Sequence, residues 1–467
     1  MKNRKFEKIL ISLLILIEIS FLFIQTFHQP LQNDENEHLY NAYMIFLGNI
    51  PYLDFFEHHN PLMWYIISPL YNIYENNINI YYIVRLFMFI CVLITGIFTY
   101  KIAKKLSFSD FYCLLSVCFY FSFNTLKTTG IQFRPDTPMT LFIIIGIYYL
   151  ITYITKKQNN KDIYLSIISF SISFWFLQKS IVFIIPTIIF ILILLFLKKV
   201  SWYNVILASF LTLFVSLIYI FYLYNNDCLN LYYIYNYIGN IENTRKYTIF
   251  KENSYFNTYK DKTILLCIIM CILSFFINIK QNKKISILSF YTIVSFIFLT
   301  HGLYGVNKHY LLPLLPLFSI ISTDILQIII NKKIFKIPFL FFFIIQQIYF
   351  DYNIIKNTHI PFNTYIKINK YITNNTSNND EVLIHVSITG IKKQAEGYYY
   401  FGEQYIIDNI YNIIPYKKLP NKKEIIINKK PKIIFDNFYA DEELYHFIIK
   451  NYIPKQIEGL TFLIKKQ

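Results

Sequence analysis

Long apolar segments recur along most of this chain, and their length constrains the fold more than any other feature. A helix of about 20 apolar residues is needed to cross the hydrocarbon core of a bilayer. About eleven such segments can be marked, at residues 9–27, 80–100, 110–126, 136–155, 163–178, 180–197, 203–223, 263–279, 285–301, 310–330 and 337–354. Only 15% of the residues are charged, whereas soluble domains contain roughly 25%. The sequence therefore predicts an all-α polytopic membrane bundle over residues 1–354, with about eleven transmembrane helices.

The first apolar segment has the basic start of a secretion signal. Residues 1–8 are basic and residues 9–27 are apolar. The stretch lacks a small-residue cleavage site, however, and it is long enough to span a bilayer. We therefore expect it to be retained as the first membrane helix.

Lysine clusters occupy every second gap between the apolar segments. These clusters are Lys101, Lys104 and Lys105; Lys156, Lys157 and Lys161; Lys198 and Lys199; Lys280, Lys283 and Lys284; and Lys332, Lys333 and Lys336. Cytoplasmic loops are enriched in lysine and arginine. The alternation predicts a multi-pass protein of the cell (inner or plasma) membrane, with a cytoplasmic N-terminus and an extracytoplasmic C-terminus. It also accounts for the net charge of +16 without nucleic acid as a partner.

The first outer loop, residues 28–79, is long and only partly apolar. Residues 33–48 and 60–74 each have amphipathic character, which predicts two helices lying at the membrane interface. A turn at residues 50–56 joins them. Polar side chains from several outer segments face the same compartment in this topology, so we expect them to converge on an extracytoplasmic site.

The last part of the chain, residues 355–467, has ordinary soluble character and predicts a small extracytoplasmic α/β domain. Residues 381–387, 432–435 and 461–464 have strand character. Residues 441–451 have helix character, with acidic residues in the first turn. This part shows no nucleophile elbow, phosphate loop or metal-ligand cluster, so we expect an accessory role.

Three short motifs lie in the outer segments. The first outer loop contains Asn33-Asp-Glu-Asn-Glu-His, followed by Gly48-Asn-Ile-Pro-Tyr-Leu-Asp-Phe-Phe-Glu-His-His-Asn-Pro. The other two are Arg134-Pro-Asp136 and Lys308-His-Tyr-Leu-Leu-Pro, each at the entrance of a later apolar segment. Together they resemble the type C membrane glycosyltransferases, in the bacterial branch related to protein O-mannosyltransferases and lipid A aminoarabinose transferases. Members carry an Asp-Glu pair after the first membrane helix, then a Gly-x-x-Pro-Tyr-x-Asp-Phe turn.

The resemblance implies an inverting glycosyltransferase that takes its sugar from a polyprenyl-phosphate-linked donor. The acceptor would be a hydroxyl of a glycolipid, a polysaccharide or a protein of the cell envelope. Such a reaction needs a carboxylate to take the hydroxyl proton. It also needs cations to stabilise the departing phosphate. The resemblance places Asp34 as the base, with Glu35 beside it as a second catalytic candidate.

The same resemblance supplies candidate ligands for the donor. The expected phosphate-binding residues are His58, His59, Arg134, Lys308 and His309, and the expected substrate-binding residues are Asp136 and Tyr310. Relatives place a basic residue before the proline of the first loop, whereas this chain has two histidines and then Asn60. Each candidate also has a structural interpretation, such as a solvated helix terminus or a snorkelling lysine.

Several further residues receive weaker predictions. Asp34 and His38 lie one helical turn apart, which allows a divalent cation, although this pair is common by chance and we assign no metal ligands. Lys179 lies in an outer turn. Arg85 lies within an apolar segment, and a position facing the bundle interior is one interpretation, since charged side chains there are often functional. Asp54 is expected to fix the turn. The six cysteines lack polar companions and predict packing roles.

Two other classes of membrane protein remain alternatives. Envelope polysaccharide polymerases or ligases tend to have arginine-rich outer loops, but the loop at 224–262 contains a single arginine, Arg245. Membrane transporters place polar residues at mid-membrane, whereas the polar motifs here lie at one surface. We therefore favour the glycosyltransferase hypothesis.

Overall fold

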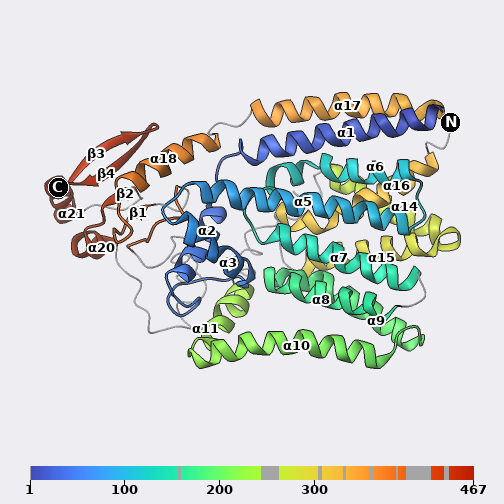
Figure 1. Cartoon of the computed structure of the whole chain (residues 1–467), viewed down its shortest axis with the longest axis horizontal. Helices are drawn as coiled ribbons and strands as arrows, with labels where there is room; N and C mark the ends of the chain where they lie inside the picture. Colours follow the sequence, from blue (N-terminus) through green and yellow to red (C-terminus); the bar gives the residue numbers. More distant parts are fainter. Residues whose placement is uncertain are drawn as a thin grey trace.

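The membrane part of the protein is a bundle of long helices that run side by side, with a small mixed unit at one end (Figure 1). The computed structural model describes residues 2–155, 159–242, 262–302, 308–329, 333–356, 361–384, 388–395, 422–435 and 441–466. The bundle helices are α1 (Lys2–Thr26), α5 (Asn79–Lys105), α6 (Asp110–Ser122), α7 (Asp136–Thr155), α8 (Asn160–Phe176), α9 (Ile181–Phe196), α10 (Trp202–Asn225), α14 (Lys262–Gln281), α15 (Lys283–Gly302), α16 (Leu315–Ile329) and α17 (Lys333–Lys356).

These helices confirm the predicted polytopic bundle. Among the described residues, nine helical segments are long and apolar enough to cross a membrane. The predicted segments 110–126 and 163–178 correspond to shorter helices, the apolar α6 and the 17-residue α8. Each of the predicted segments therefore coincides with a helix, while the number of actual crossings stays a prediction. Large apolar side chains such as Phe210, Phe214 and Phe221 of α10 are exposed, as expected of a face that meets lipid.

Close helix packing inside the bundle depends on small residues. At Gly146 of α7, an added Cβ would lie 2.8 Å from the ring of Phe170 in α8. Ser166 of α8 donates a hydrogen bond of 2.9 Å to the Gly146 carbonyl at the same crossing. Small residues allow membrane helices to approach in this way, and the packing fixes the loops that α7 and α8 carry.

The first outer loop differs in one respect from its prediction. It contains α2 (Asn33–Phe46), α3 (Leu62–Ile67), the 3-10 turn η1 (Ser68–Leu70) and α4 (Tyr71–Tyr74). Both predicted helical regions are present, although Pro69 lies where the second one is interrupted. The side chains of α2 from Glu35 to Met44 are buried on all sides. This helix is therefore enclosed by protein, with α3 and Gly390 of the C-terminal part packed against it, while its place relative to the membrane interface stays a prediction.

The C-terminal part contains a four-stranded sheet of order β1-β2-β4-β3. Its strands are β1 (Leu383–Ile384), β2 (Ile433–Phe435), β3 (Tyr452–Ile457) and β4 (Leu460–Lys465), and its helices are α18 (Phe362–Asn374), α20 (Lys422–Lys429) and α21 (Glu442–Asn451). The pair β1–β2 is parallel, and β4 is antiparallel to both β2 and β3. The sheet is thus mixed, with one parallel and two antiparallel strand pairs.

The predicted strands 432–435 and 461–464 and the predicted helix 441–451 are present. The predicted strand 381–387 is present at Leu383–Ile384, and residues 385–387 lie outside the described residues. Strand β3 and helices α18 and α20 were not predicted. An alternation of buried apolar and exposed polar residues is the usual sequence signal for a strand. The edge strand β3 lacks this alternation, since four of its successive residues are exposed.

The C-terminal part contacts the bundle next to the start of α2. The backbone N–H of Phe362 in α18 donates to the His28 carbonyl over 3.1 Å. At Gly390, an added Cβ would lie 2.1 Å from the backbone oxygen of Asn36. The Gly390 N–H also donates to the hydroxyl of Tyr81 in α5 over 3.0 Å. Backbone therefore packs directly on backbone within one turn of Asp34.

Candidate active site

Asp34 lies in the first turn of α2, whose start is fixed by local hydrogen bonds. Gln32 is the N-cap residue, and its backbone N–H donates to the Glu35 carboxylate over 3.0 Å. This capping box satisfies donors that a helix start leaves free. The Asp34 side chain is 41% exposed. A carboxylate held on a fixed helix start, yet open to solvent, can receive a proton from an incoming molecule.

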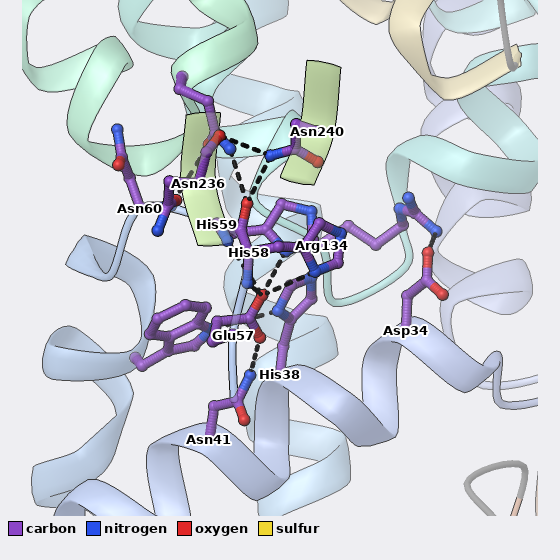
Figure 2. Close-up of polar contacts among 12 residues, drawn as sticks. Asp34, His38, Asn41, Glu57, His58, His59, Asn60, Arg134, Asn236 and Asn240 are labelled. Atoms are coloured by element: carbon purple, nitrogen blue, oxygen red, sulfur yellow. Dashed lines mark hydrogen bonds and ion pairs between the residues drawn. The ribbon is translucent and has the colours of Figure 1, made fainter. Parts of the chain in front are cut away.

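Arg134 brings three of the predicted site residues together. Its guanidinium donates a short hydrogen bond to Asp34 (Figure 2). It also lies 3.4 Å from the carboxylate of Asp136 and 3.0 Å from Nε2 of His309. The Arg134 side chain is only 13% exposed. Its three polar partners and the surrounding protein together fix its position. Its charge is therefore concentrated beside Asp34.

Glu35 points to a different partner. Its carboxylate forms a two-pronged ion pair with Arg85 of α5, with distances of 2.9 and 2.7 Å, and both side chains are buried. It also accepts the backbone N–H of Phe133 over 2.9 Å. Glu35 thus ties α2 to α5 and to the segment before Arg134. This geometry fits positioning of Asp34 better than proton transfer.

Arg85 completes that anchor. It donates to the carbonyls of Thr26, Gln29 and Pro30 at 2.8 to 2.9 Å. The guanidinium also lies 4.4 Å from the ring centroid of Phe362 in α18. The chain between α1 and α2 is therefore wrapped around one buried cation. The sequence contained one indication of this anchor, an arginine within the apolar segment 80–100, but the sequence alone did not show which groups Arg85 would contact.

The turn after α2 carries the second group of polar residues. Asp54 accepts the backbone N–H of Ile50 over 2.6 Å, in agreement with its predicted role in the turn. Tyr52 has a positive φ of 71° and donates its hydroxyl to the His59 carbonyl over 2.8 Å. The His58 carbonyl accepts from Gln178 (2.7 Å) and from Asn240 (3.0 Å). The backbone of His58 and His59 is therefore fixed from three sides.

Glu57 organises both histidines. One carboxylate oxygen accepts the backbone N–H groups of His58 and His59 at 2.7 and 3.0 Å, and lies 2.7 Å from Nδ1 of His59. Asn41 of α2 donates to the other oxygen (Figure 2). Burial raises the pKa of Glu57 to about 7. Sequence reasoning did not single out Glu57, although it directly precedes the two histidines.

Burial favours the neutral form of both histidines. Burial, and to a smaller extent the nearby Lys179, lower the pKa of His59 to about 3. Burial also holds the pKa of His58 well below its usual value. Neutral imidazoles can donate hydrogen bonds to a phosphate but bring no charge to it.

The lysine that lies against this group is Lys179, in the turn η3 (Gln178–Ser180). Its Nζ donates to the hydroxyl of Tyr310 over 2.7 Å and lies 3.9 Å from the centroid of the same ring. Lys308 begins the 3-10 segment η5 (Lys308–Leu314) and is exposed. The structure therefore brings Tyr310 together with Lys179, a residue that the sequence ranked low.

Asp34 and His38 contact different partners. Nδ1 of His38 accepts the indole N–H of Trp64 over 3.1 Å, and its ring packs edge-on against His59. Asp34 is directed to Arg134 instead. Among the described residues, the group that could hold a metal ion is Glu37, Glu57, His58 and His59, a set that the sequence did not predict.

Part of the chain is similar to a known protein family. Residues 58–220 match the family model described as dolichyl-phosphate-mannose-protein mannosyltransferase. The match begins at His58 and includes Arg134, Asp136 and Lys179. No curated protein sequence matches.

Solved structures of membrane glycosyltransferases share the fold. ArnT from Cupriavidus metallidurans in the apo state has a TM-score of 0.50 and 11% sequence identity, covering 67% of this chain and 58% of that chain. The Archaeoglobus fulgidus oligosaccharyltransferase in complex with Zn and sulfate has a TM-score of 0.52 and 12% identity, covering 84% and 62%. The oligosaccharyltransferase AglB of the same organism, in complex with an inhibitory peptide and a dolichol-phosphate, has a TM-score of 0.51 and 11% identity, covering 92% and 69%.

The chain spans less than two thirds of the length of the first two of these structures. The family model and the fold together confirm the predicted resemblance to the type C membrane glycosyltransferases. The chain is accordingly a multi-pass membrane protein with the fold of that family.

Proposed function

We propose that this protein is an inverting glycosyltransferase that moves a sugar from a polyprenyl-phosphate-linked donor to a hydroxyl of an envelope acceptor on the outer face of the cell membrane. The acceptor is a glycolipid, a polysaccharide or a protein. The observation that carries the proposal is the contact of Arg134 with Asp34, which joins a partly exposed carboxylate to a largely enclosed cation. The mannosyltransferase family match and the dolichol-phosphate in the AglB complex support this donor class.

Asp34 is the proposed general base. It takes the proton of the acceptor hydroxyl while that oxygen bonds to the anomeric carbon, on the face opposite the phosphate. The bond between the anomeric carbon and the phosphate oxygen breaks, and the lipid phosphate leaves with the electron pair. One base and a stabilised leaving group are then sufficient for transfer with inversion.

The proposed phosphate ligands are Arg134 and Lys179, with hydrogen bonds from His58, His59 and His309 and with Lys308 at the exposed edge. An arginine can contact two phosphate oxygens at once. Asp136 orients the Arg134 guanidinium, and Tyr310 orients Lys179. These fixed cations stabilise the negative charge that develops on the departing phosphate.

The proposed topology places residues 28–79, Arg134, Lys308 and residues 355–467 outside the membrane, with the N-terminus in the cytoplasm. The lysine alternation supports this orientation. Labelling of single cysteines introduced at exposed positions, such as Asn33 and Lys455, tests it in intact cells. Reaction of either position from the cytoplasmic side alone would exclude an extracytoplasmic site.

Sugar transfer from a synthetic polyprenyl-phosphate donor, measured in membranes, tests the activity. Asp34→Asn removes the base while keeping a hydrogen-bond partner for Arg134, so we expect a loss of roughly 10²–10⁴-fold in kcat. Asp34→Glu keeps a carboxylate and is expected to retain more activity. Unchanged transfer by Asp34→Asn would refute the assignment.

A further inference from the structure

A cavity of about 940 Å³ lies where α9 ends and α10 begins. Its lining comes from the ends of α7, α8, α9 and α10 and from the turn that joins α9 to α10. Helix α2, which carries Asp34, lies at the opposite end of the bundle (Figure 1). The cavity is therefore remote from the proposed active site and has no part in the proposed reaction.

Two adjacent lysines, Lys198 and Lys199, line this cavity from a turn whose backbone is fixed. Their N–H groups donate to the carbonyls of Leu195 and Leu194 over 2.9 and 2.8 Å. The hydroxyl of Tyr153 in α7 donates to the Lys199 carbonyl over 2.8 Å. Both lysine side chains are exposed, and within the described part of the chain neither forms an ion pair. Two positive charges are thus held at the cavity without a protein counter-charge.

A buried amide adds hydrogen-bond donors to the same cavity. Asn204, in the first turn of α10, lines the cavity and is only 6% exposed. Its Oδ1 accepts the hydroxyl of Tyr164 in α8 over 2.6 Å. Its Nδ2 donates no hydrogen bond to any residue that the structure describes. Buried polar groups normally have a partner, and a ligand with acceptor oxygens in the cavity can provide one here.

The remaining wall of the cavity is apolar and continues onto the outside of the bundle. Leu192 and Phe196 of α9 line the cavity and are 50% and 86% exposed. Trp202, at the start of α10, also lines it and is 60% exposed. Tryptophan is enriched at the level of the lipid head groups in membrane proteins. The cavity therefore suits a ligand with an anionic head and an apolar tail that extends along α9.

We propose that this cavity binds one phospholipid of net negative charge. The phosphate oxygens contact Lys198, Lys199 and the free amide N–H groups of Asn204. The acyl chains lie along Leu192 and Phe196. Basic pockets between membrane helices are known to bind anionic head groups. A zwitterionic phospholipid has the same phosphate, but its own cation opposes the two lysines, so net charge decides which lipid is bound. The site is independent of the proposed sugar transfer.

Native mass spectrometry of the full-length protein in detergent, titrated with phosphatidylglycerol or with phosphatidylcholine, tests this site. We expect one phosphatidylglycerol to bind on the order of 10-fold more tightly than phosphatidylcholine. The double variant Lys198→Gln/Lys199→Gln should weaken phosphatidylglycerol binding on the order of 10-fold or more and abolish the preference. Asn204→Asp keeps an oxygen for Tyr164 but replaces the amide donor by a negative charge, so it should weaken binding as well.

The matched control is Lys283→Gln/Lys284→Gln, which removes an adjacent pair of exposed lysines that do not line the cavity. This variant should bind phosphatidylglycerol like the wild type. Equal binding of the two lipids by the wild type, or an equal loss in both double variants, would overturn the proposal. Glycerol 3-phosphate has the phosphate without acyl chains and should not displace the lipid. Displacement at millimolar concentration would show that the site recognises a soluble phosphate instead.

Discussion

Arg134 and Asp34 are separated by 100 residues in the sequence, yet the guanidinium of one donates directly to the carboxylate of the other. This contact joins the start of α2 to the segment that precedes α7. It places the proposed base next to the proposed phosphate ligand. The carboxylate that would accept the acceptor's proton and the cation that would stabilise the leaving phosphate are therefore neighbours. The predictions below follow from this pair and from the contacts that hold it.

Replacing Arg134 by lysine should impair transfer although the charge is kept. A lysine cannot contact Asp34, Asp136 and His309 together in the fork geometry of a guanidinium. We expect kcat/KM for the donor to fall roughly 10²-fold, the size typical for loss of one transition-state contact. Lys104→Ala, at an exposed ion pair with Asp110, is the control and should transfer sugar normally. Wild-type rates for Arg134→Lys would show that the guanidinium geometry is unimportant.

Lys179 should contribute more to donor binding than Lys308 does. Lys179 is held against Tyr310 in the interior of the site, whereas Lys308 is exposed. A charge in a poorly solvated site interacts more strongly with phosphate. We expect Lys179→Gln to raise the KM for the donor by about 10-fold and Lys308→Gln by less than about 3-fold. A larger effect of Lys308→Gln than of Lys179→Gln would instead favour Lys308, the phosphate ligand that the sequence motif alone suggested.

Glu35→Gln should destabilise the protein. The substitution leaves the buried Arg85 without its counter-charge, a loss that typically costs about 3–5 kcal/mol. Thermal unfolding in detergent measures it, and the double variant Glu35→Leu/Arg85→Met should recover much of the stability because both buried charges are gone. A Glu35→Gln protein with normal stability but no activity would instead indicate that Glu35 takes part in the chemistry.

Gly390→Ala should separate the C-terminal part from α2. The added methyl group would lie 2.1 Å from the Asn36 backbone oxygen, so one of the two segments must move. We expect a loss of about 1–3 kcal/mol in stability, as for other overpacked sites, together with lower transfer activity. The control is Gly459→Ala, because Gly459 lies in the turn between β3 and β4 and an added Cβ there would have open space around it. It should cost only about 1 kcal/mol of backbone strain and leave activity intact.

Lys392 provides a prediction for pH dependence. The side chain is 1% exposed, and burial outweighs the opposing effect of Asp380 and Glu75, so that the pKa of Lys392 is lowered to about 8. Below pH 8 both folded and unfolded states carry the proton, so the folded state bears the full cost of a buried charge. Between pH 8 and the ordinary lysine value the folded state loses its proton first, and stability rises with pH.

Lys392→Met should therefore raise the melting temperature at pH 7, by an amount equivalent to roughly 1–3 kcal/mol, and the gain should shrink towards pH 10. Lys393→Met is the matched control, since Lys393 is exposed and forms a surface ion pair with Glu381. Its effect should be small at both pH values. A pH-independent gain for Lys392→Met would show that its charge is not the cause.

Local structure within the motifs could be predicted where the spacing of adjacent residues carries the information, while the roles of the site residues stay predictions. The Asp54 turn follows from a few adjacent residues, and so does the start of α2. The contacts of individual charged residues could not be predicted in this way. Arg85 and Lys179 received little weight and Glu57 none, because nothing in the neighbouring sequence shows which side chain a folded bundle will bring to them.

By itself, the sequence determined the class of this protein. Apolar segments of membrane-spanning length fix the helical bundle, since the cost of exposing backbone polar groups to lipid leaves few other structures. Tertiary structure alone decided which charges are paired. It separated Asp34, which faces Arg134 and solvent, from Glu35, which is buried against Arg85, although the two are adjacent. Folding also buried His58 and His59 beside Glu37 and Glu57, which lowers the pKa of both histidines. Such outcomes depend on desolvation and on contacts between distant segments, and neither is encoded in local spacing.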